Sequence, residues 1–355
     1  MIYQGYLGGN LTKEIQIGKV KIGNENNIAI QSMTNTDSKD IKATINQIIQ
    51  LRHAGCDIVR VAIYDDECIK TIKEIKKNVD IPIVADIHFD YKLAINSIKN
   101  GVDKIRINPG NIGSKDRVIE IINNAKEYNI PIRVGVNCGS LPKHLYKIYE
   151  HSKYEAMFLA VKEQVDILEE QNFTDIVISA KSSNVLDTIK INEIIHKRYA
   201  YPLHLGVTEA GTYNRGSIKS SIAFGVLINE GIGDTIRVSL TDDPVNEVHV
   251  AKEILKSLNK YDKGIDIISC PTCGRTQVNI IKIANEIEEK IKYIDKNITV
   301  AIMGCGVNGP NEAKHADIGI AGGIKEALLF KKGKIIRKIS EDNIVKELLD
   351  EIKKM

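Results

Sequence analysis

Three cysteines near the end of the chain have the spacing of a metal or cluster site. Cys270 and Cys273 form a C-x-x-C pair, and Cys305 follows in a glycine-rich stretch that ends at Glu312. A C-x-x-C pair brings two sulfurs to one centre, and the third sulfur must come from a separate element. A closed structural zinc site takes four nitrogen or sulfur ligands, whereas three thiolates leave one position open or bound by a weaker oxygen ligand. The pattern indicates a reactive iron–sulfur site, and a structural zinc with His315 or another group as fourth ligand is the alternative.

A second group of residues, most of them cationic, falls on predicted β-strands earlier in the chain. The cations are Arg60, Arg106, Arg133, Lys181 and Arg237. Side chains two residues apart share one face of a strand, which adds three polar residues: Asn108, Asn137 and Ser239. The acidic or titratable residues of the same region are Asp86, His88 and Glu209. Unpaired buried charge is costly, so this excess of cations predicts an anionic ligand. A substrate with two phosphates would fit, because arginine binds phosphate through paired hydrogen bonds.

Each of these residues also has an ordinary structural interpretation. Any single arginine could point outward into a surface ion pair. Glu209 follows Thr208 at the end of a predicted strand, where a general acid could lie, but a loop carboxylate that pairs with an arginine is equally compatible. Asp86 and His88 could form a proton relay or a simple inward-facing pair. The residues alone leave these alternatives open.

Eight short apolar, β-branched runs are spaced widely enough for a helix to follow each predicted strand. They cover residues 28–31, 58–63, 81–87, 104–108, 132–137, 175–181, 203–208 and 235–240. Segments with helical periodicity lie between them, among them 41–53, 116–128, 154–171 and 217–229. Strands that alternate with helices require a parallel sheet with right-handed crossovers. Eight such units predict an α/β protein with a closed (β/α)8 TIM-type barrel rather than an open doubly wound sheet.

A polar stretch near Lys260 predicts the end of the barrel and divides the chain into domains 1–260 and 261–355. The second domain is expected to be a smaller α+β iron–sulfur unit. It should contain a helix at 278–294, a strand at 299–303 that leads to Cys305, a hairpin from 327–330 and 335–339, and a last helix capped by Ser340. A short hairpin around Gly18 is expected before the barrel.

The composition argues against several classes of protein. The chain has 355 residues and a formal net charge of +3, so no overall field favours nucleic acid or a membrane surface. No apolar stretch approaches membrane-spanning length, and the first residues lack the pattern of a signal peptide. Six cysteines in a chain of this length argue against a disulfide framework and fit a reducing compartment. We therefore expect a cytoplasmic protein that binds neither nucleic acid nor membrane.

Motifs along nearly the whole chain resemble the 4-hydroxy-3-methylbut-2-enyl diphosphate synthase family, iron–sulfur enzymes of the methylerythritol phosphate route to isoprenoids. In the cysteine-containing region the motifs are Cys270-Pro-Thr-Cys-Gly-Arg-Thr, Met-Gly-Cys305-Gly-Val-Asn-Gly-Pro-Asn-Glu312-Ala and Ala316-Asp-Ile-Gly-Ile-Ala-Gly-Gly323. In the predicted barrel they are Gln31-Ser-Met-Thr34, Ala85-Asp-Ile-His88, Ile105-Arg-Ile-Asn-Pro-Gly110, Arg133-Val-Gly-Val-Asn137, Leu205-Gly-Val-Thr-Glu-Ala-Gly211 and Ile236-Arg-Val-Ser-Leu240. The resemblance is to the compact two-domain bacterial form.

The resemblance implies a reaction, a cofactor and partners. Members of this family reduce 2-C-methyl-D-erythritol 2,4-cyclodiphosphate by two electrons, open the ring and release water, which gives 4-hydroxy-3-methylbut-2-enyl diphosphate. A [4Fe-4S] cluster would be held by Cys270, Cys273, Cys305 and Glu312. Reduced flavodoxin or ferredoxin would supply the electrons singly. The family also implies a homodimer in which the cluster domain of one subunit faces the barrel of its partner.

The same motifs imply roles for the barrel residues. The diphosphate would be bound by Arg60, Arg106, Asn108, Arg133, Asn137, Lys181, Thr208, Arg237 and Ser239. Glu209 would donate the proton to the hydroxyl that leaves, and Asp86 and His88 are the other candidate catalytic residues. Gly306 and Asn311 depart from the valine and glycine usual in the third-cysteine motif, which could alter how readily Glu312 is displaced.

Two other functions are compatible with parts of the pattern. A phosphate-handling aldolase or pterin-type barrel with a structural zinc appendage would be colourless and active in air. A cluster-bearing sensor or nucleic-acid binder is the second alternative, and the lack of a basic stripe in the sequence argues against it.

Overall fold

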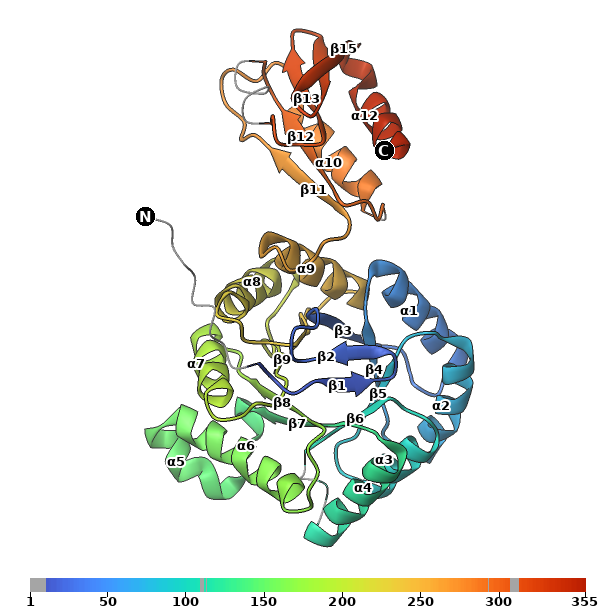
Figure 1. Ribbon diagram of the computed structural model, residues 1–355, viewed down its shortest axis with the longest axis vertical. Coiled ribbons are helices and arrows are strands. Elements are labelled where there is room, and N and C mark those ends of the chain that lie inside the picture. The colour runs from blue at the N-terminus through green and yellow to red at the C-terminus, as the bar shows by residue number, and fades with distance from the viewer. Residues whose placement is uncertain (1–10, 109–111, 113, 293, 307–312) are drawn as a thin grey trace. The chain divides into compact units, whose positions relative to one another are not determined.

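The computed structural model describes residues 11–108, 112, 114–292, 294–306 and 313–355 (Figure 1). The chain forms two compact units, Met1–Tyr261 and Asp262–Met355. None of the helices within the described ranges is long and apolar enough to cross a membrane.

Eight parallel strands form the barrel of the first unit. They are β3 (Ala29–Met33), β4 (Ile58–Ala62), β5 (Ile83–Asp86), β6 (Lys104–Ile107), β7 (Ile132–Asn137), β8 (Ile176–Lys181), β9 (His204–Leu205) and β10 (Thr235–Ile236). The strands pair in the order β8-β7-β6-β5-β4-β3-β10-β9. A parallel bridge between Ile178 and Leu203 then joins β8 to β9 and closes the circle. The predicted (β/α)8 barrel is therefore confirmed.

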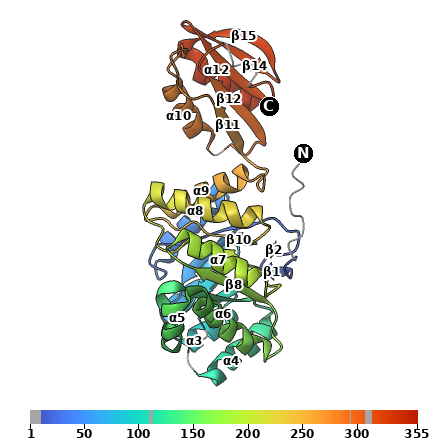
Figure 2. The same ribbon diagram turned by 90° about the vertical axis from the view of Figure 1, so that its left-hand side faces the viewer.

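Helices surround these strands and bury their apolar faces against them (Figure 1). The helices are α1 (Ile41–Ala54), α2 (Asp66–Asn78), α3 (Tyr91–Lys99), α4 (Lys115–Tyr128), α5 (Tyr146–His151), α6 (Lys153–Glu169), α7 (Val185–His196), α8 (Tyr213–Asn229) and α9 (Pro244–Ser257). Short 3-10 turns lie at Cys138–Ser140 and Lys143–Leu145. Figure 2 shows α6 and α7 in the outer layer beside β8.

A hairpin of β1 (Ile15–Ile17) and β2 (Val20–Ile22) closes the amino end of the barrel. Ile15, Ile17 and Ile22 are buried against residues near the starts of the barrel strands, including Ala29 and Ile58. This hairpin is the one expected around Gly18. Because one end of the barrel is filled with apolar side chains, polar residues that point into the barrel are reached from its carboxyl end.

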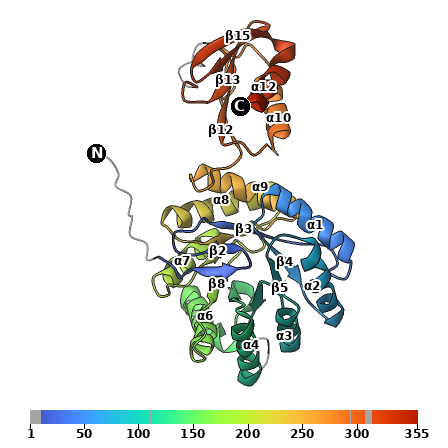
Figure 3. The same cartoon turned by 45° about the vertical axis from the view of Figure 1, so that its right-hand side comes forward.

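The second unit is a five-stranded mixed sheet with helices on one face (Figure 3). Its strands, in sheet order, are β11 (Ile265–Ser269), β12 (Ile298–Met303), β13 (Ile318–Gly323), β14 (Glu326–Lys331) and β15 (Lys334–Ser340). Helices α10 (Ile280–Ile291) and α12 (Ile344–Lys354) bury apolar residues against the sheet. The expected smaller α+β unit is confirmed.

Several details of the second unit differ from the sequence expectations. The strands β11 and β13 were not predicted, because β11 is largely exposed and β13 contains three glycines, so neither gives a clear apolar run. The last helix does not start at Ser340. A 3-10 turn (Glu341–Asn343) comes first, the Ser340 side chain makes no capping hydrogen bond, and α12 begins at Ile344.

Candidate active site

The structure brings the predicted cations together at the carboxyl end of the barrel. In the strand register Asp86 lies opposite Arg106, Arg106 lies opposite Arg133, and Asn137 lies opposite Lys181. Arg60, Arg106, Arg133 and Lys181 are all buried. Their charged groups lie inside the barrel, so the interpretation of each as an outward surface pair does not apply. We call this region the cationic mouth.

Asp86 is the carboxylate at the centre of one half of the mouth. Its oxygens lie 3.1 Å from Arg106 Nη1, 3.7 Å from Arg60 Nε and 3.6 Å from His88 Nε2. Arg106 Nη1 also lies 2.9 Å from His88 Nε2. Burial by itself would raise the pKa of Asp86, but Arg60, His88 and Arg106 together hold that pKa well below its usual range. Asp86 is therefore an ionised acceptor that orients two arginines, and a role as proton donor does not fit.

Arg133 shows most directly that the mouth is built for an anion. The residue is 3% exposed, and its Nε and Nη1 have no hydrogen-bond partner among the described residues. Arg106 Nε and Ser179 Oγ nearby are also without partners in that part of the chain. Burial, with Arg60 and Arg106 close by, lowers the pKa of Arg133 well below its usual value. Several buried donors that lack an acceptor indicate a negatively charged ligand.

Gly135 keeps open the space between these donors. A Cβ at this position would lie 3.7 Å from Arg133 Nη2, 3.8 Å from Arg106 Nε and 3.9 Å from Ser179 Cβ. A larger side chain would therefore extend among the unpartnered donors and compete with an anion for them.

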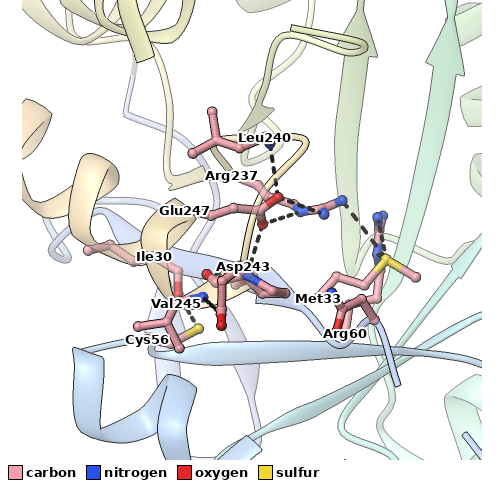
Figure 4. Close-up of polar contacts among 12 residues, drawn as sticks. Ile30, Met33, Cys56, Arg60, Arg237, Leu240, Asp243, Val245 and Glu247 are labelled. Carbon is pink, nitrogen blue, oxygen red and sulfur yellow. Dashed lines mark hydrogen bonds and ion pairs between the residues drawn. The ribbon is translucent and has the colours of Figure 1, made fainter. Parts of the chain in front are cut away.

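Arg237 is held from the opposite side of the mouth (Figure 4). Glu247, near the start of α9, accepts hydrogen bonds from Arg237 Nε at 3.2 Å and Nη2 at 3.3 Å. Its carboxylate also accepts from Ser32 Oγ at 2.9 Å and from Leu240 N at 3.1 Å. The sulfur of Met33 accepts from Arg60 Nε and Nη2 at 3.1 and 3.0 Å and lies 3.9 Å from Arg237 Nη1. Met33 thus lies between two guanidinium groups.

The remaining predicted residues lie at the rim. Asn108 is buried, whereas Asn137, Thr208 and Ser239 are half-buried and His88 and Glu209 are exposed. The Thr208 amide donates to Ser182 O at 3.1 Å, which anchors the end of the β9 segment beside β8. Glu209 has φ +51°, a left-handed conformation that is uncommon for a residue other than glycine. Such local strain is typical of functional loops and supports a role for Glu209.

The sequence analysis missed several buried polar residues of the barrel interior. Among them are Gln31, Lys104, His204 and Glu247, and the partly buried Met33, whose sulfur contacts Arg60, was missed as well. Period-two alternation places Lys104 on the face of Arg106, and His204 on the face of Gly206 and Thr208, so this signal could have found both. Glu247 lies on a helix outside the strand pattern, and no comparable signal identifies it.

In the second unit, two of the three cysteines come from neighbouring strand ends. Strands β11 and β12 pair in parallel with Ser269 opposite Ile302, so Cys270 and Cys305 follow at the same edge of the sheet. Cys270 Sγ accepts a hydrogen bond from Gly304 N at 3.1 Å. Amide donors to cysteine sulfur are a feature that tunes iron–sulfur clusters. Cys273 is exposed, and its amide donates to Thr276 Oγ1 at 3.2 Å.

The donor chemistry fits a cluster in part. All six cysteines are free thiols rather than disulfides. Within the described ranges no three metal-binding side chains lie together, and Glu312, the predicted fourth ligand, lies outside those ranges. The ends of two paired strands thus bring Cys270 and Cys305 to one edge of the sheet.

Comparisons with known proteins agree with both units. Residues 12–252 match the GcpE TIM-barrel domain, and residues 266–354 match the GcpE protein C-terminal domain. Proteins named 4-hydroxy-3-methylbut-2-en-1-yl diphosphate synthase (flavodoxin) are 58% identical in Ruminiclostridium cellulolyticum, over 98% of both chains, and 60% identical in Caldicellulosiruptor saccharolyticus, over 96% of this chain and 98% of that one.

Among solved structures, the N-acetylneuraminic acid synthetase of Leptospira borgpetersenii has a TM-score of 0.50 at 12% identity, covering 71% of this chain and 92% of that one. That likeness shows a shared barrel fold alone. The relatives at more than half identity extend over both units, so the chain belongs to the 4-hydroxy-3-methylbut-2-en-1-yl diphosphate synthase family of oxidoreductases.

Proposed function

We propose that this protein reduces 2-C-methyl-D-erythritol 2,4-cyclodiphosphate with two electrons, opens the ring and releases water to give 4-hydroxy-3-methylbut-2-enyl diphosphate. Family membership supports the reaction class. The observation that carries the substrate assignment is Arg133, a buried guanidinium with unpartnered donors beside two further arginines. A substrate with two phosphates supplies acceptors in the number and charge that these donors need.

The mouth residues act by binding and orientation. Arg60, Arg106, Arg133, Lys181 and Arg237 bind the diphosphate, and Asn108, Asn137, Thr208 and Ser239 bind its remaining oxygens. Asp86 and Glu247 hold arginines in place before the ligand arrives, which reduces the reorganisation needed on binding. His88 contacts Arg106 at the exposed rim and orients its guanidinium group.

Glu209 is the proposed proton donor for the hydroxyl that leaves. It lies on the rim loop after β9, exposed and with strained backbone geometry. A carboxylic acid at that place can reach a ligand whose phosphates lie deeper among the arginines.

Cys270, Cys273 and Cys305, with Glu312 on the fourth position, are the proposed ligands of a [4Fe-4S] cluster. When bound, such a cluster passes electrons one at a time to a substrate at its open position. The adjacent origins of Cys270 and Cys305 and the amide hydrogen bond to Cys270 Sγ support the assignment. An oxygen ligand is displaced from iron more readily than a thiolate, which suits a position that substrate must take.

Reduced flavodoxin is the proposed electron donor, because it stands in the names of the relatives, and ferredoxin is the second candidate. We also propose a cytoplasmic homodimer in which the cluster unit of one subunit serves the barrel of its partner. An exposed apolar row on α8, formed by Ile218, Ile222 and Val226, offers a surface that a second copy could cover.

Anaerobic purification with metal analysis and a turnover assay tests this function. The protein should be brown, contain about four irons per chain and convert the cyclodiphosphate in the presence of a strong reductant. Cys305→Ser should lose the cluster and the activity, whereas Cys56→Ser, at a buried thiol of the barrel, should keep both. Stoichiometric zinc in a colourless protein would instead favour the aldolase-like alternative.

A further inference from the structure

Below the cationic mouth, a buried histidine contacts one of the cations. His204, the first residue of β9, is fully buried. Its Nε2 lies 3.3 Å from Lys181 Nζ, and its Nδ1 lies 2.7 Å from Thr235 Oγ1 on β10. The imidazole therefore connects residues of three neighbouring strands, β8, β9 and β10.

The surroundings of His204 determine its protonation state. Burial, with Arg133, Lys181 and Lys104 nearby, lowers the pKa of His204 well below its usual value, so the ring is neutral. A neutral imidazole has one donor and one acceptor nitrogen. Burial, with Arg133 and Arg60 nearby, lowers the pKa of Lys181 well below its usual value, whereas an anion in the mouth favours the protonated form, an ammonium group that can only donate. Nε2 is then the acceptor for Lys181, and Nδ1–H donates to Thr235 Oγ1.

Gly206 lies two residues after His204 on the same face of the chain, and because it has no side chain it leaves room for the side chain of Lys181. A Cβ at Gly206 would lie 2.4 Å from Lys181 Nζ and 2.8 Å from its Cε. The φ of Gly206 is outside the left-handed region, so the requirement for glycine here is one of space and not of backbone conformation. His204 thus supplies an acceptor for the ammonium group of Lys181, and Gly206 leaves room for that group.

We propose that His204 is a positioning residue for anion binding: its Nε2 fixes the ammonium group of Lys181 in the cationic mouth, and Gly206 provides the space for that side chain. Lys181 reaches the phosphate, and His204 acts through Lys181. The inference rests on the proposed function for the identity of the natural anion, but the geometry requires only a phosphate-bearing ligand.

Substitutions can test the roles of the two His204 nitrogens separately. His204→Asn places an amide near the position of Nδ1, which retains the Thr235 contact and loses the acceptor for Lys181. His204→Gln reaches the position of Nε2 and restores that acceptor. His196→Asn, at the partly buried end of α7, is the matched control outside the mouth.

Calorimetry of inorganic pyrophosphate binding to the full-length protein is the primary measurement. His204→Asn should weaken binding about tenfold, the factor expected for one hydrogen bond to a charged group, while His204→Gln and His196→Asn bind as the wild type does. Gly206→Ala should weaken binding as well. The thermal midpoints are measured alongside to show that the variants are folded.

A double-mutant cycle separates positioning from a general structural role. In a Lys181→Met background, His204→Asn should cause no further loss of pyrophosphate affinity, because the two residues act as one unit. Additive losses, or wild-type affinity in His204→Asn, would overturn the proposal. Steady-state assays with the cyclodiphosphate then extend the test: the KM should rise in His204→Asn with little change in kcat. If the cycle shows this coupling in pyrophosphate binding but the wild-type protein does not turn over the cyclodiphosphate, the proposed function is refuted and this inference stands.

Discussion

Glu247 and Arg237 form a two-point ion pair at the edge of the barrel interior, with Oε2 3.2 Å from Nε and Oε1 3.3 Å from Nη2. The same carboxylate accepts from Ser32 on β3 and from the amide of Leu240 after β10. A single helical residue thus orients an arginine of the cationic mouth and joins the segments on either side of it.

Glu247→Ala should destabilise the protein by about 3–5 kcal/mol, because it removes the buried carboxylate that pairs with the partly buried Arg237 charge. Urea denaturation measures this change. Glu253→Ala is the matched control on α9, since Glu253 is exposed and forms a surface ion pair with Lys256, and its effect should stay within about 0.5 kcal/mol. Equal effects of the two substitutions would contradict the role given to Glu247.

Asp86→Asn should destabilise the ligand-free protein at neutral pH, because Arg60 and Arg106 lose their anionic partner. The pKa of Asp86 is lowered on folding, so its contribution to stability is full above the unfolded-state pKa of about 3.9 and is lost as pH falls toward the folded-state value. The stability difference between the wild type and Asp86→Asn should therefore shrink in acid. A difference that is constant across this range would contradict the assignment.

Lys104→Met should stabilise the ligand-free protein by about 1–4 kcal/mol at neutral pH, since an apolar side chain of similar size replaces a buried amine. Burial, then Arg133 and Arg60, lowers the pKa of Lys104, so folding is disfavoured while the unfolded lysine is protonated. That cost disappears as pH rises from the lowered folded-state pKa to about 10.4. The advantage of Lys104→Met over the wild type should accordingly decrease at alkaline pH, and pH-dependent denaturation curves test it.

Glu209→Gln should lower kcat about a hundredfold or more and leave the iron content and the KM nearly unchanged, because a carboxamide cannot donate the proton. Glu230→Gln, at the end of α8, is the control and should keep full activity. Wild-type kcat in Glu209→Gln would remove the proton-donor role from this residue.

The strand pattern was sufficient to predict the barrel. The structure shows why the last two strands are shorter than the predicted runs. The runs 203–208 and 235–240 alternate apolar residues with polar or small ones, as strands do, but ladder pairing is limited to His204–Leu205 and Thr235–Ile236. At Gly206 the side chain of Lys181 passes close to the backbone, and Leu240 N bonds the Glu247 carboxylate instead of a neighbouring strand. The ends of these two segments therefore contact polar groups of the barrel interior instead of extending the strand ladder.

The site was predictable where strand alternation determines direction, as for Arg60, Arg106 and Arg133. Glu247 could not be found in this way, because its contact with Arg237 depends on how α9 packs, and the contact of Met33 with Arg60 depends on the β3–β4 register, which places the two residues opposite each other. The pairing of Asp86 with Arg60, Arg106 and His88 also required coordinates, since alternation says which face a residue occupies and not which partner it selects.

The electron stoichiometry of turnover is the most direct measurement of the central claim. Under anaerobic conditions, with fully reduced flavodoxin as a one-electron donor, two equivalents should be oxidised for each molecule of 4-hydroxy-3-methylbut-2-enyl diphosphate formed from the cyclodiphosphate. Consumption of the cyclodiphosphate without flavodoxin oxidation, or no product at all from iron-replete protein, would contradict the account.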